Sequence, residues 1–295
     1  MSAAHKVRLF GAAYRMLGSA CDADELVAAA LGRTAQTAYG PASVADRDAA
    51  LVSDVVGAAI AALEASRQRR DAHAGSWLPE PVLTETGVLG PLETAEARES
   101  VSLARLVVLE RLTPVERAAF VLREMFGYGT AESAAVLGVP EVRGRAMQRR
   151  ARRRVRESAG PRGEEMSVQE RRTLAEELLR ATTDADEAAL AELLHEDVVS
   201  WSDGGGQEGM TRRPVLGAAK VGRFLAGLLA KAPEGTHGTV AEINGDAAVV
   251  ALAAGDVVGV LAPEFGPQGL LGLRTVADPQ RLVYLNRQWA ERPRD

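Results

Sequence analysis

Arginine is concentrated in one short stretch of this 295-residue sequence, between Glu141 and Arg156. The stretch contains Arg143, Arg145, Arg149, Arg150, Arg152, Arg153, Arg154 and Arg156. A guanidinium group can hold a phosphate anywhere along a nucleic acid, or it can read guanine with two hydrogen bonds. The stretch is therefore a candidate DNA-binding helix, with a solvated arginine-rich helix as the alternative.

Two helices predicted just before this stretch would position it. Thr113, Pro114 and Glu116 form a capping-box pattern at the start of the first. A short helix begins at Thr130, and Gly138 marks a turn before the arginines. A helix, a tight turn and a basic helix are typical of a helix-turn-helix whose second helix enters the major groove.

The predicted DNA contacts divide along the basic helix. Arg143 and Arg145 lie near its start and are placed for base edges, whereas the arginines from 149 to 156 are placed for phosphates. The predicted DNA-binding residues are Thr130, Arg143, Arg145, Arg149, Arg150, Arg152 and Arg153.

Composition limits the other classes of protein. With 46% hydrophobic and 25% charged residues the chain is not wholly disordered, and a net charge of −5 excludes a uniformly basic nucleic-acid binder. A single cysteine, Cys21, excludes an internal disulfide or a multi-cysteine zinc site. No apolar run approaches the ~20 residues that span a bilayer. We expect a cytoplasmic protein with no membrane contact, no metal and no cofactor.

Shifts in residue character predict a multidomain, mostly helical protein. The predicted parts are an all-α domain at 1–74, a linker rich in proline and glycine at 75–99, a helix-turn-helix domain at 100–160 and an α+β domain at 167–295. The last part has predicted helices over Val168–His195 and Ala218–Lys231, and predicted strands at Val198–Trp201, Gly238–Ile243, Ala247–Ala253, Asp256–Leu261 and Leu270–Val276.

The α+β domain contains side chains that could act as a general base. They are His195, Asp197, Asp203, His237 and Asp246. Catalysis needs a pKa tuned by burial or by neighbours, and the sequence shows neither. His195 is explained by a favourable position at a helix C-terminus, and Asp197 and Asp246 by turns. We therefore assign no catalytic residue and predict that the chain is not an enzyme.

Several strings in register resemble one family over nearly the whole chain. They are Leu9-Phe10-Gly11-Ala12-Ala13-Tyr14-Arg15-Met16-Leu17-Gly18-Ser19, Trp77-Leu78-Pro79-Glu80-Pro81, the segment Leu112–Arg152, Asp203-Gly204-Gly205-Gly206-Gln207 and Asp278-Pro279-Gln280-Arg281-Leu282. The chain resembles extracytoplasmic-function (ECF) RNA polymerase sigma factors of the SigJ-like group, which carry a fused SnoaL-like domain at the C-terminus.

The resemblance implies a fold and partners. It implies a region 2 helical bundle, a region 4 helix-turn-helix and a cone-shaped α+β SnoaL-like domain, with core RNA polymerase and promoter DNA as partners. It also implies that two loops of the last domain contact the sigma core. Together with the linker, the predicted interdomain residues are Trp77, Pro79, Pro81, Asp203, Gly204, Gly205, Gly206, Asp278, Pro279 and Arg281. A pocket in the C-terminal domain leaves room for a small ligand.

Residues 1–74, which correspond to region 2 of the family, depart from the family pattern. Ala28-Ala29-Ala30-Leu31-Gly32 replaces a segment that in the family helps to grip RNA polymerase, and Ala61-Ala62-Leu63-Glu64 replaces a basic stretch. No lysine occurs between Phe10 and Trp77. Promoter melting needs cations on phosphates and surfaces for stacking flipped bases. The alternative function is therefore a degenerate paralogue, a protein- or ligand-binding module that does not open promoters.

The linker contains one large aromatic, Trp77, beside Pro79 and Pro81. Proline biases the residue before it away from helix, so Leu78 and Glu80 should be extended. We expect Trp77 to pack at an interface between domains, with the C-terminal domain holding regions 2 and 4 in a compact arrangement. The alternative is that Trp77 caps the core of region 2.

Overall fold

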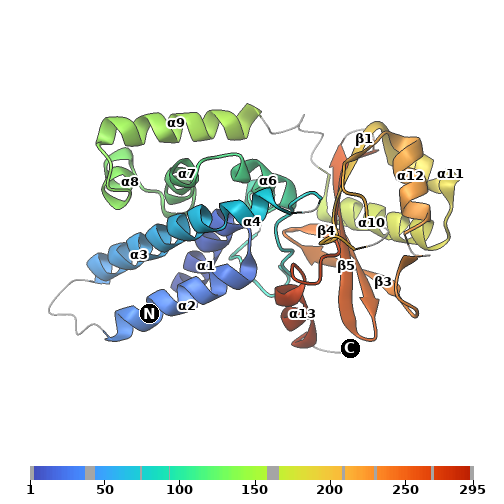
Figure 1. Ribbon diagram of the computed structural model, residues 1–295, viewed down its shortest axis with the longest axis horizontal. Coiled ribbons are helices and arrows are strands. Elements are labelled where there is room, and N and C mark those ends of the chain that lie inside the picture. The colour runs from blue at the N-terminus through green and yellow to red at the C-terminus, as the bar shows by residue number, and fades with distance from the viewer. Residues whose placement is uncertain are drawn as a thin grey trace. The chain divides into compact units, whose positions relative to one another are not determined.

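The structure is a computed structural model that describes residues 3–36, 44–73, 75–92, 94–157, 166–207, 210–228, 231–266 and 269–292. The chain forms two compact units. The first contains residues 1–71, 87–91 and 105–160, and the second contains 72–86, 92–104 and 161–295 (Figure 1).

The first unit begins with a bundle of three helices and a short fourth one. They are α1 (Ala3–Leu17), α2 (Ala20–Gln36), α3 (Val44–Ala65) and α4 (Arg67–Asp71). Gly18 has a φ of 69°, a left-handed conformation that ends α1 where the Gly18-Ser19 pair predicts a stop. Leu9, Tyr14 and Val55 are fully or almost fully buried in the bundle.

The remaining helices of this unit include the predicted helix-turn-helix. They are α6 (Leu103–Glu110), whose first two residues belong to the second unit, α7 (Pro114–Phe126), α8 (Thr130–Val136) and α9 (Glu141–Glu157). The predicted capping box is confirmed, because the Thr113 hydroxyl accepts the Glu116 N–H and the Glu116 carboxylate accepts the Thr113 N–H. Gly138, with a φ of 61°, forms the turn before α9.

The second unit contains one mixed sheet of six strands in the order β2-β1-β6-β5-β4-β3. The strands are β1 (Leu194–Asp203), β2 (Val215–Leu216), β3 (His237–Ile243), β4 (Asp246–Ala253), β5 (Asp256–Gly266) and β6 (Gly269–Val276). β1 and β6 are parallel, and the other pairs are antiparallel. Each predicted strand lies within or closely matches one of these, whereas β2 was not predicted.

In the described part of the second unit, the helices beside this sheet are α5 (Ala95–Glu99), α10 (Val168–Thr183), α11 (Glu187–Leu193), α12 (Ala218–Ala226) and α13 (Val283–Ala290). Helices α10, α11 and α12 contact the strands and share a buried core with them that includes Leu178, Val221 and Leu261 (Figure 1). α13 packs against β5 and was not predicted. α12 ends at Ala226, before the predicted Lys231, and residues 229 and 230 lie outside the described part of the chain.

The predicted helical segment Val168–His195 forms two helices, α10 and α11, and the second ends at Leu193. The chain turns after α10, where Ala185 has a φ of 51°, and Asp186 then caps α11 by accepting the N–H groups of Ala188 and Ala189. His195 is the second residue of β1 and not a helix terminus. The explanation of His195 by its position at a helix C-terminus is therefore wrong.

Candidate functional site

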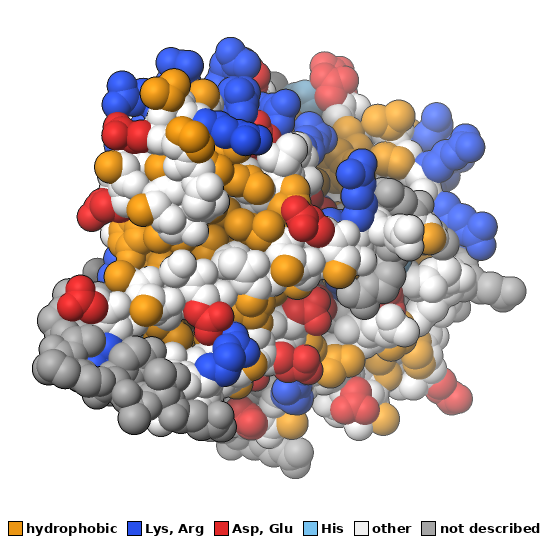
Figure 2. Space-filling model, turned by 60° about the vertical axis from the view of Figure 1, so that its left-hand side comes forward, with side chains coloured by type: hydrophobic (Ala, Val, Ile, Leu, Met, Phe, Trp, Pro, Cys, Tyr) orange, Lys and Arg blue, Asp and Glu red, His pale blue; other side chains and the backbone are white. Residues whose placement is uncertain are grey.

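The exposed face of α9 carries the predicted DNA-binding arginines. The face that packs on α7 and α8 buries Gly144, Met147, Gln148, Ala151 and Val155, while every arginine of the helix is exposed. Figure 2 shows basic side chains gathered over α9, along the top of the first unit, and few elsewhere on the helical part of that face. The sequence therefore folds into an amphipathic helix whose outer face is cationic.

Five arginines of the first unit surround a shallow hollow of about 240 Å³. Its lining is Arg123, Arg145, Gln148, Arg149, Arg152 and Arg156. Arg123 comes from α7 and was not among the predicted contacts. A concave surface lined by cations attracts phosphate and raises the rate of association with a polyanion.

The predicted arginines differ in how they are paired. Arg145 donates to Glu141, one turn earlier, at 2.9 Å, and Arg153 lies 3.8 Å from Glu157. Both pairs are exposed, so they stabilise the helix only weakly. These arginines keep their outward position and can exchange a carboxylate for a phosphate.

Arg150 and Arg154 have a structural role that the sequence did not predict. The Glu116 carboxylate is 6% exposed and accepts hydrogen bonds from Arg150 Nε and Arg154 Nη1, each at 3.0 Å. Burial of Glu116 opposes its ionisation, but the bonds from Arg150 and Thr113 and the charge of Arg154 outweigh it and lower the pKa of Glu116. One carboxylate thus caps α7 and fastens α9 to it.

Close packing between α8 and α9 depends on Gly144. A Cβ at this position would lie 3.1 Å from the Cβ of Ala134, tighter than ordinary contacts. Gln148 donates to the Ser133 hydroxyl at 3.0 Å, and the Thr130 hydroxyl lies 3.4 Å from the Gln148 oxygen. Thr130 is therefore at the start of α8 and beside the buried side of α9.

A second cluster of predicted residues lies in the second unit, around Asp203 at the end of β1. The Asp203 carboxylate is fully buried and pairs with His73 Nε2 at 2.7 Å. It also accepts the N–H of Leu78 at 2.9 Å and lies 3.8 Å from Arg281 Nε. The backbone oxygen of Asp203 accepts the N–H groups of Ala277 and Asp278. Asp203 therefore joins the linker to the segment Asp278–Leu282, the tail motif.

Trp77 contacts two side chains of this cluster, Arg281 and His73. The guanidinium carbon of Arg281 lies 3.5 Å from the centre of the Trp77 ring, a close cation–π contact. The His73 ring meets the Trp77 ring edge-on, with centroids 5.0 Å apart. Arg281 also lies 3.9 Å from the buried carboxylate of Glu80. Pro79 and Pro81 are buried beside Glu80.

The linker continues along the second unit beyond Pro81. Val82 exchanges hydrogen bonds with Asn244, donating to its side chain and accepting its N–H, each at 2.9 Å. Leu83 does the same with the Gln288 amide of α13, at 2.9 and 3.0 Å. The string Asn244-Gly245-Asp246 predicts only a hairpin turn, and no motif in the sequence predicts a role for His73 or Gln288. The spacing of such single polar side chains carries no signal for a contact this distant in sequence.

The triglycine turn places Gly205 against the tail motif. A triglycine turn predicts positive backbone angles. Gly205 and Gly206 have φ values of 58° and 88°, whereas Gly204 is not among the positive-φ residues. A Cβ on Gly205 would lie 2.6 Å from Asp278 Cγ, and one on Gly204 would lie 2.5 Å from Met210 Cγ. Pro279 is exposed next to Asp278. The predicted loop residues are thus brought together.

His73, Asp203 and Asp278 offer ligand atoms within 4.8 Å of one another. Both Asp203 oxygens already have partners in His73, Leu78 and the Arg281 cation. Asp278 accepts the N–H of Gln280. The Arg281 guanidinium already balances the negative charge of Asp203, so we assign no metal to this cluster.

The other side chains weighed for catalysis are scattered. Asp197 and His195 are neighbours in β1, where His195 Nδ1 accepts the Asp197 N–H, and His237 is exposed at the start of β3. Asp246 pairs with Arg171 of α10 at 2.6 Å, and burial raises the pKa of Asp246 despite this partner. Asp246 thus pins α10 to the β3–β4 turn.

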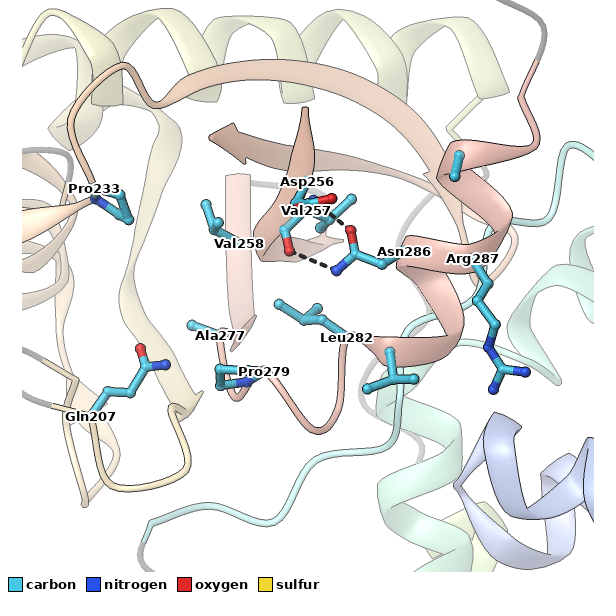
Figure 3. A pocket seen from close by; sticks show the side chains of 12 residues that line it. Gln207, Pro233, Asp256, Val257, Val258, Ala277, Pro279, Leu282, Asn286 and Arg287 are labelled. Atoms are coloured by element: carbon cyan, nitrogen blue, oxygen red, sulfur yellow. Dashed lines mark hydrogen bonds between the residues drawn. The ribbon is translucent and has the colours of Figure 1, made fainter. Parts of the chain in front are cut away.

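A larger hollow of about 640 Å³ lies beside α13 (Figure 3). Its wall is mostly apolar: Pro233, Val257, Val258, Ala277, Pro279, Leu282, Val283 and Ala290, with Gln207, Asp256, Asn286 and Arg287. Asn286 is occupied by two hydrogen bonds to the backbone of Val257, which hold α13 on β5. None of the five candidate bases lines it.

Within the described ranges, no helix combines the length and the apolar character that crossing a membrane requires.

Comparisons with known proteins agree with this geometry. The family "Sigma-70, region 4" matches residues 106–155, which include α7, α8 and most of α9. The ECF RNA polymerase sigma factor SigJ of Mycobacterium tuberculosis is 33% identical over 240 residues, 81% of this chain and 76% of that protein. The probable ECF sigma factor SigI of the same species is 27% identical over 221 residues, 74% of this chain and 72% of SigI.

A solved structure extends the match to the whole fold. The crystal structure of Mycobacterium tuberculosis SigJ superposes with a TM-score of 0.71 at 27% identity, covering 95% of this chain and 96% of that one. The predicted fold class, two helical sigma domains and an α+β SnoaL-like domain, is confirmed. Sigma factors regulate transcription and are not enzymes. The chain belongs to the ECF family of RNA polymerase sigma factors.

Proposed function

We propose that this chain directs transcription initiation, binding promoter DNA through α8 and α9 while attached to core RNA polymerase in the cytoplasm. The observation that carries the proposal is the cationic outer face of α9 within a helix-turn-helix. A free recognition helix with its arginines outward is the arrangement that enters a major groove.

The positions of the arginines along α9 support different tasks for them. Arg143 and Arg145, at the start of α9, would reach base edges, and Arg149, Arg152 and Arg153 would hold phosphates. Thr130, the first residue of α8, would contact the DNA backbone. Arg150 is held by Glu116 and would reach a phosphate with the part of its guanidinium that remains exposed.

The C-terminal domain is proposed to modulate this activity through the linker. Linker residues 76–84 are fastened to the domain by the contacts of Trp77, Leu78, Val82 and Leu83. The linker joins region 2 to region 4 in the chain, so its path limits the distance and orientation between these two regions. Release or retention of the linker by the domain would therefore alter promoter binding.

A degenerate paralogue remains the second candidate because of the surface of region 2. Arg15 is buried, and desolvation lowers its pKa to about 10, while Arg33 pairs with Asp54 at 2.9 Å. Arg15 is therefore withdrawn from the surface, and Arg33 faces a carboxylate. Such a protein would keep the DNA- or protein-binding helix and lose promoter opening.

Capture on immobilised core RNA polymerase of Mycobacterium tuberculosis separates the two candidates. The sigma proposal expects the full chain to be retained at low salt and displaced by the SigJ relative. A chain that binds duplex DNA but is not retained on core polymerase would favour the degenerate paralogue. Leu216→Glu, which changes an exposed side chain of β2, is a suitable control for folding and charge.

The hollow beside α13 is proposed to take a small, mostly apolar molecule. Its volume falls in the usual range for ligand sites, and its two charged wall residues, Asp256 and Arg287, have opposite signs. Anilinonaphthalene sulfonate should fluoresce on binding, and Val258→Trp should abolish the signal by filling the space. Leu216→Trp is the control, and equal signals from both variants would place the probe elsewhere.

A further inference from the structure

Val142 is an apolar side chain in an unexpected place. It is 83% exposed, the most exposed of the large hydrophobic residues in the described chain, and it is the second residue of α9. A β-branched residue slightly disfavours helix, and burial gives Val142 almost no stabilisation. Folding therefore does not account for valine at this position.

The helix geometry places Val142 among the arginines. Successive residues turn by about 100° around a helix, so Arg145 and Arg149 follow Val142 at spacings of three and seven on the same face. The buried residues Gly144, Ala151 and Val155 are on the opposite face. Val142 thus stands at the N-terminal end of the cationic face, ahead of the arginines that line the hollow.

The N-terminal residues of a recognition helix are those that reach base edges in the major groove. The only apolar group that a base pair presents there is the 5-methyl group of thymine. We infer that Val142 is a specificity-determining residue that packs against a thymine methyl group in the major groove of the promoter. This inference rests on the proposed DNA binding by α8 and α9.

The contact would complement the arginines beside it. Arg143 and Arg145 select guanine through hydrogen bonds, whereas an isopropyl group selects thymine by excluding water from its methyl group. The start of α9 then reads two kinds of base with two kinds of side chain.

Removal of the methyl group from the DNA tests the inference directly. Duplexes with a randomised segment are selected on the full chain at low salt, and the enriched duplex is then remade with deoxyuridine at each thymine in turn. The wild-type chain should bind one uracil-substituted duplex about fourfold more weakly, the ratio expected for burial of one methyl group. Val142→Ala should bind the two duplexes equally.

The controls separate failure of the inference from failure of the proposed function. Val168→Ala, an exposed valine at the start of α10, should retain the fourfold discrimination. Equal binding of thymine and uracil duplexes by the wild type, or unchanged discrimination by Val142→Ala, would overturn the role of Val142 alone. Failure to enrich any duplex would overturn DNA binding by the helix-turn-helix as well.

Discussion

The guanidinium carbon of Arg281 lies 3.5 Å from the centre of the Trp77 ring, although 204 positions separate the two residues in the chain. The same guanidinium is 3.8 Å from Asp203 and 3.9 Å from Glu80. One cation therefore serves an aromatic ring and two buried carboxylates. The position of the linker on the C-terminal domain depends on this side chain.

Arg281→Lys should loosen the linker. Lysine keeps the charge but loses the planar group that stacks on the ring and reaches two carboxylates together. Hydrogen exchange of the amides from 76 to 84 should become faster, most clearly at Leu78, whose N–H is bonded to Asp203. Arg287→Lys, which changes a cation lying over Tyr284, is the matched control. Unchanged exchange in Arg281→Lys would contradict this role.

Gly205→Ala and Gly206→Ala should differ in their effect on stability. Both glycines have positive φ values, so alanine costs each about 1 kcal/mol or more. Only Gly205 is crowded, by Asp278, and overpacking adds about 1–3 kcal/mol there, whereas a Cβ on Gly206 meets open space. Thermal denaturation should show the larger loss for Gly205→Ala. Equal losses would mean that the turn does not press on the tail motif.

Glu116→Gln should destabilise the helix-turn-helix and flatten its dependence on pH. The amide loses the charge-assisted bonds to Arg150 and Arg154, about 1–2 kcal/mol after allowance for the exposed arginines. The pKa of Glu116 is lower in the folded state, so the ionised form favours folding.

This contribution is complete above the ordinary pKa of 4.5 and is lost as the pH falls through the lower folded-state value. Melting temperatures measured from neutral pH to below 4.5 should therefore fall more steeply for the wild type than for Glu116→Gln. Parallel curves would show that the carboxylate does not fasten α9 to α7.

Arg152→Ala and Arg154→Ala should separate DNA binding from folding. Arg152 lines the cationic hollow, so its loss should weaken all duplexes alike and reduce the salt slope of binding by about 1. Arg154 is bonded to Glu116, so its loss should lower the melting temperature of the chain as well. The measurements are binding at several salt concentrations and thermal denaturation. Equal melting temperatures for the two variants would refute the division.

Local signals in the sequence predicted much of the fold. Thr113 and Glu116 cap α7 through neighbouring backbone groups, and Asn244-Gly245 turns between β3 and β4 with both φ values positive. These features depend on residues a few positions apart, so a single sequence contains them. α13 was missed because its short apolar stripe, with Leu285 buried, is interrupted by polar residues that bind β5 and the linker.

The candidate sites were predicted less completely because they depend on distant partners. The arginines of α9 were visible as a run, but the run does not show that Arg150 and Arg154 share a buried glutamate 34 and 38 residues earlier. Asp203 was identified with its glycine turn, whereas His73 has no motif of its own. Only folding brings its ring nitrogen to that carboxylate.

Run-off transcription with core RNA polymerase tests the central claim most directly, on a template that carries the duplex enriched by the full chain. The wild-type chain should yield a discrete transcript that core polymerase alone does not. The double variant Arg149→Ala, Arg152→Ala should still be captured by core polymerase but yield at least tenfold less transcript, because two phosphate contacts are lost. A wild-type chain that binds core polymerase and the template without yielding a transcript would contradict the account.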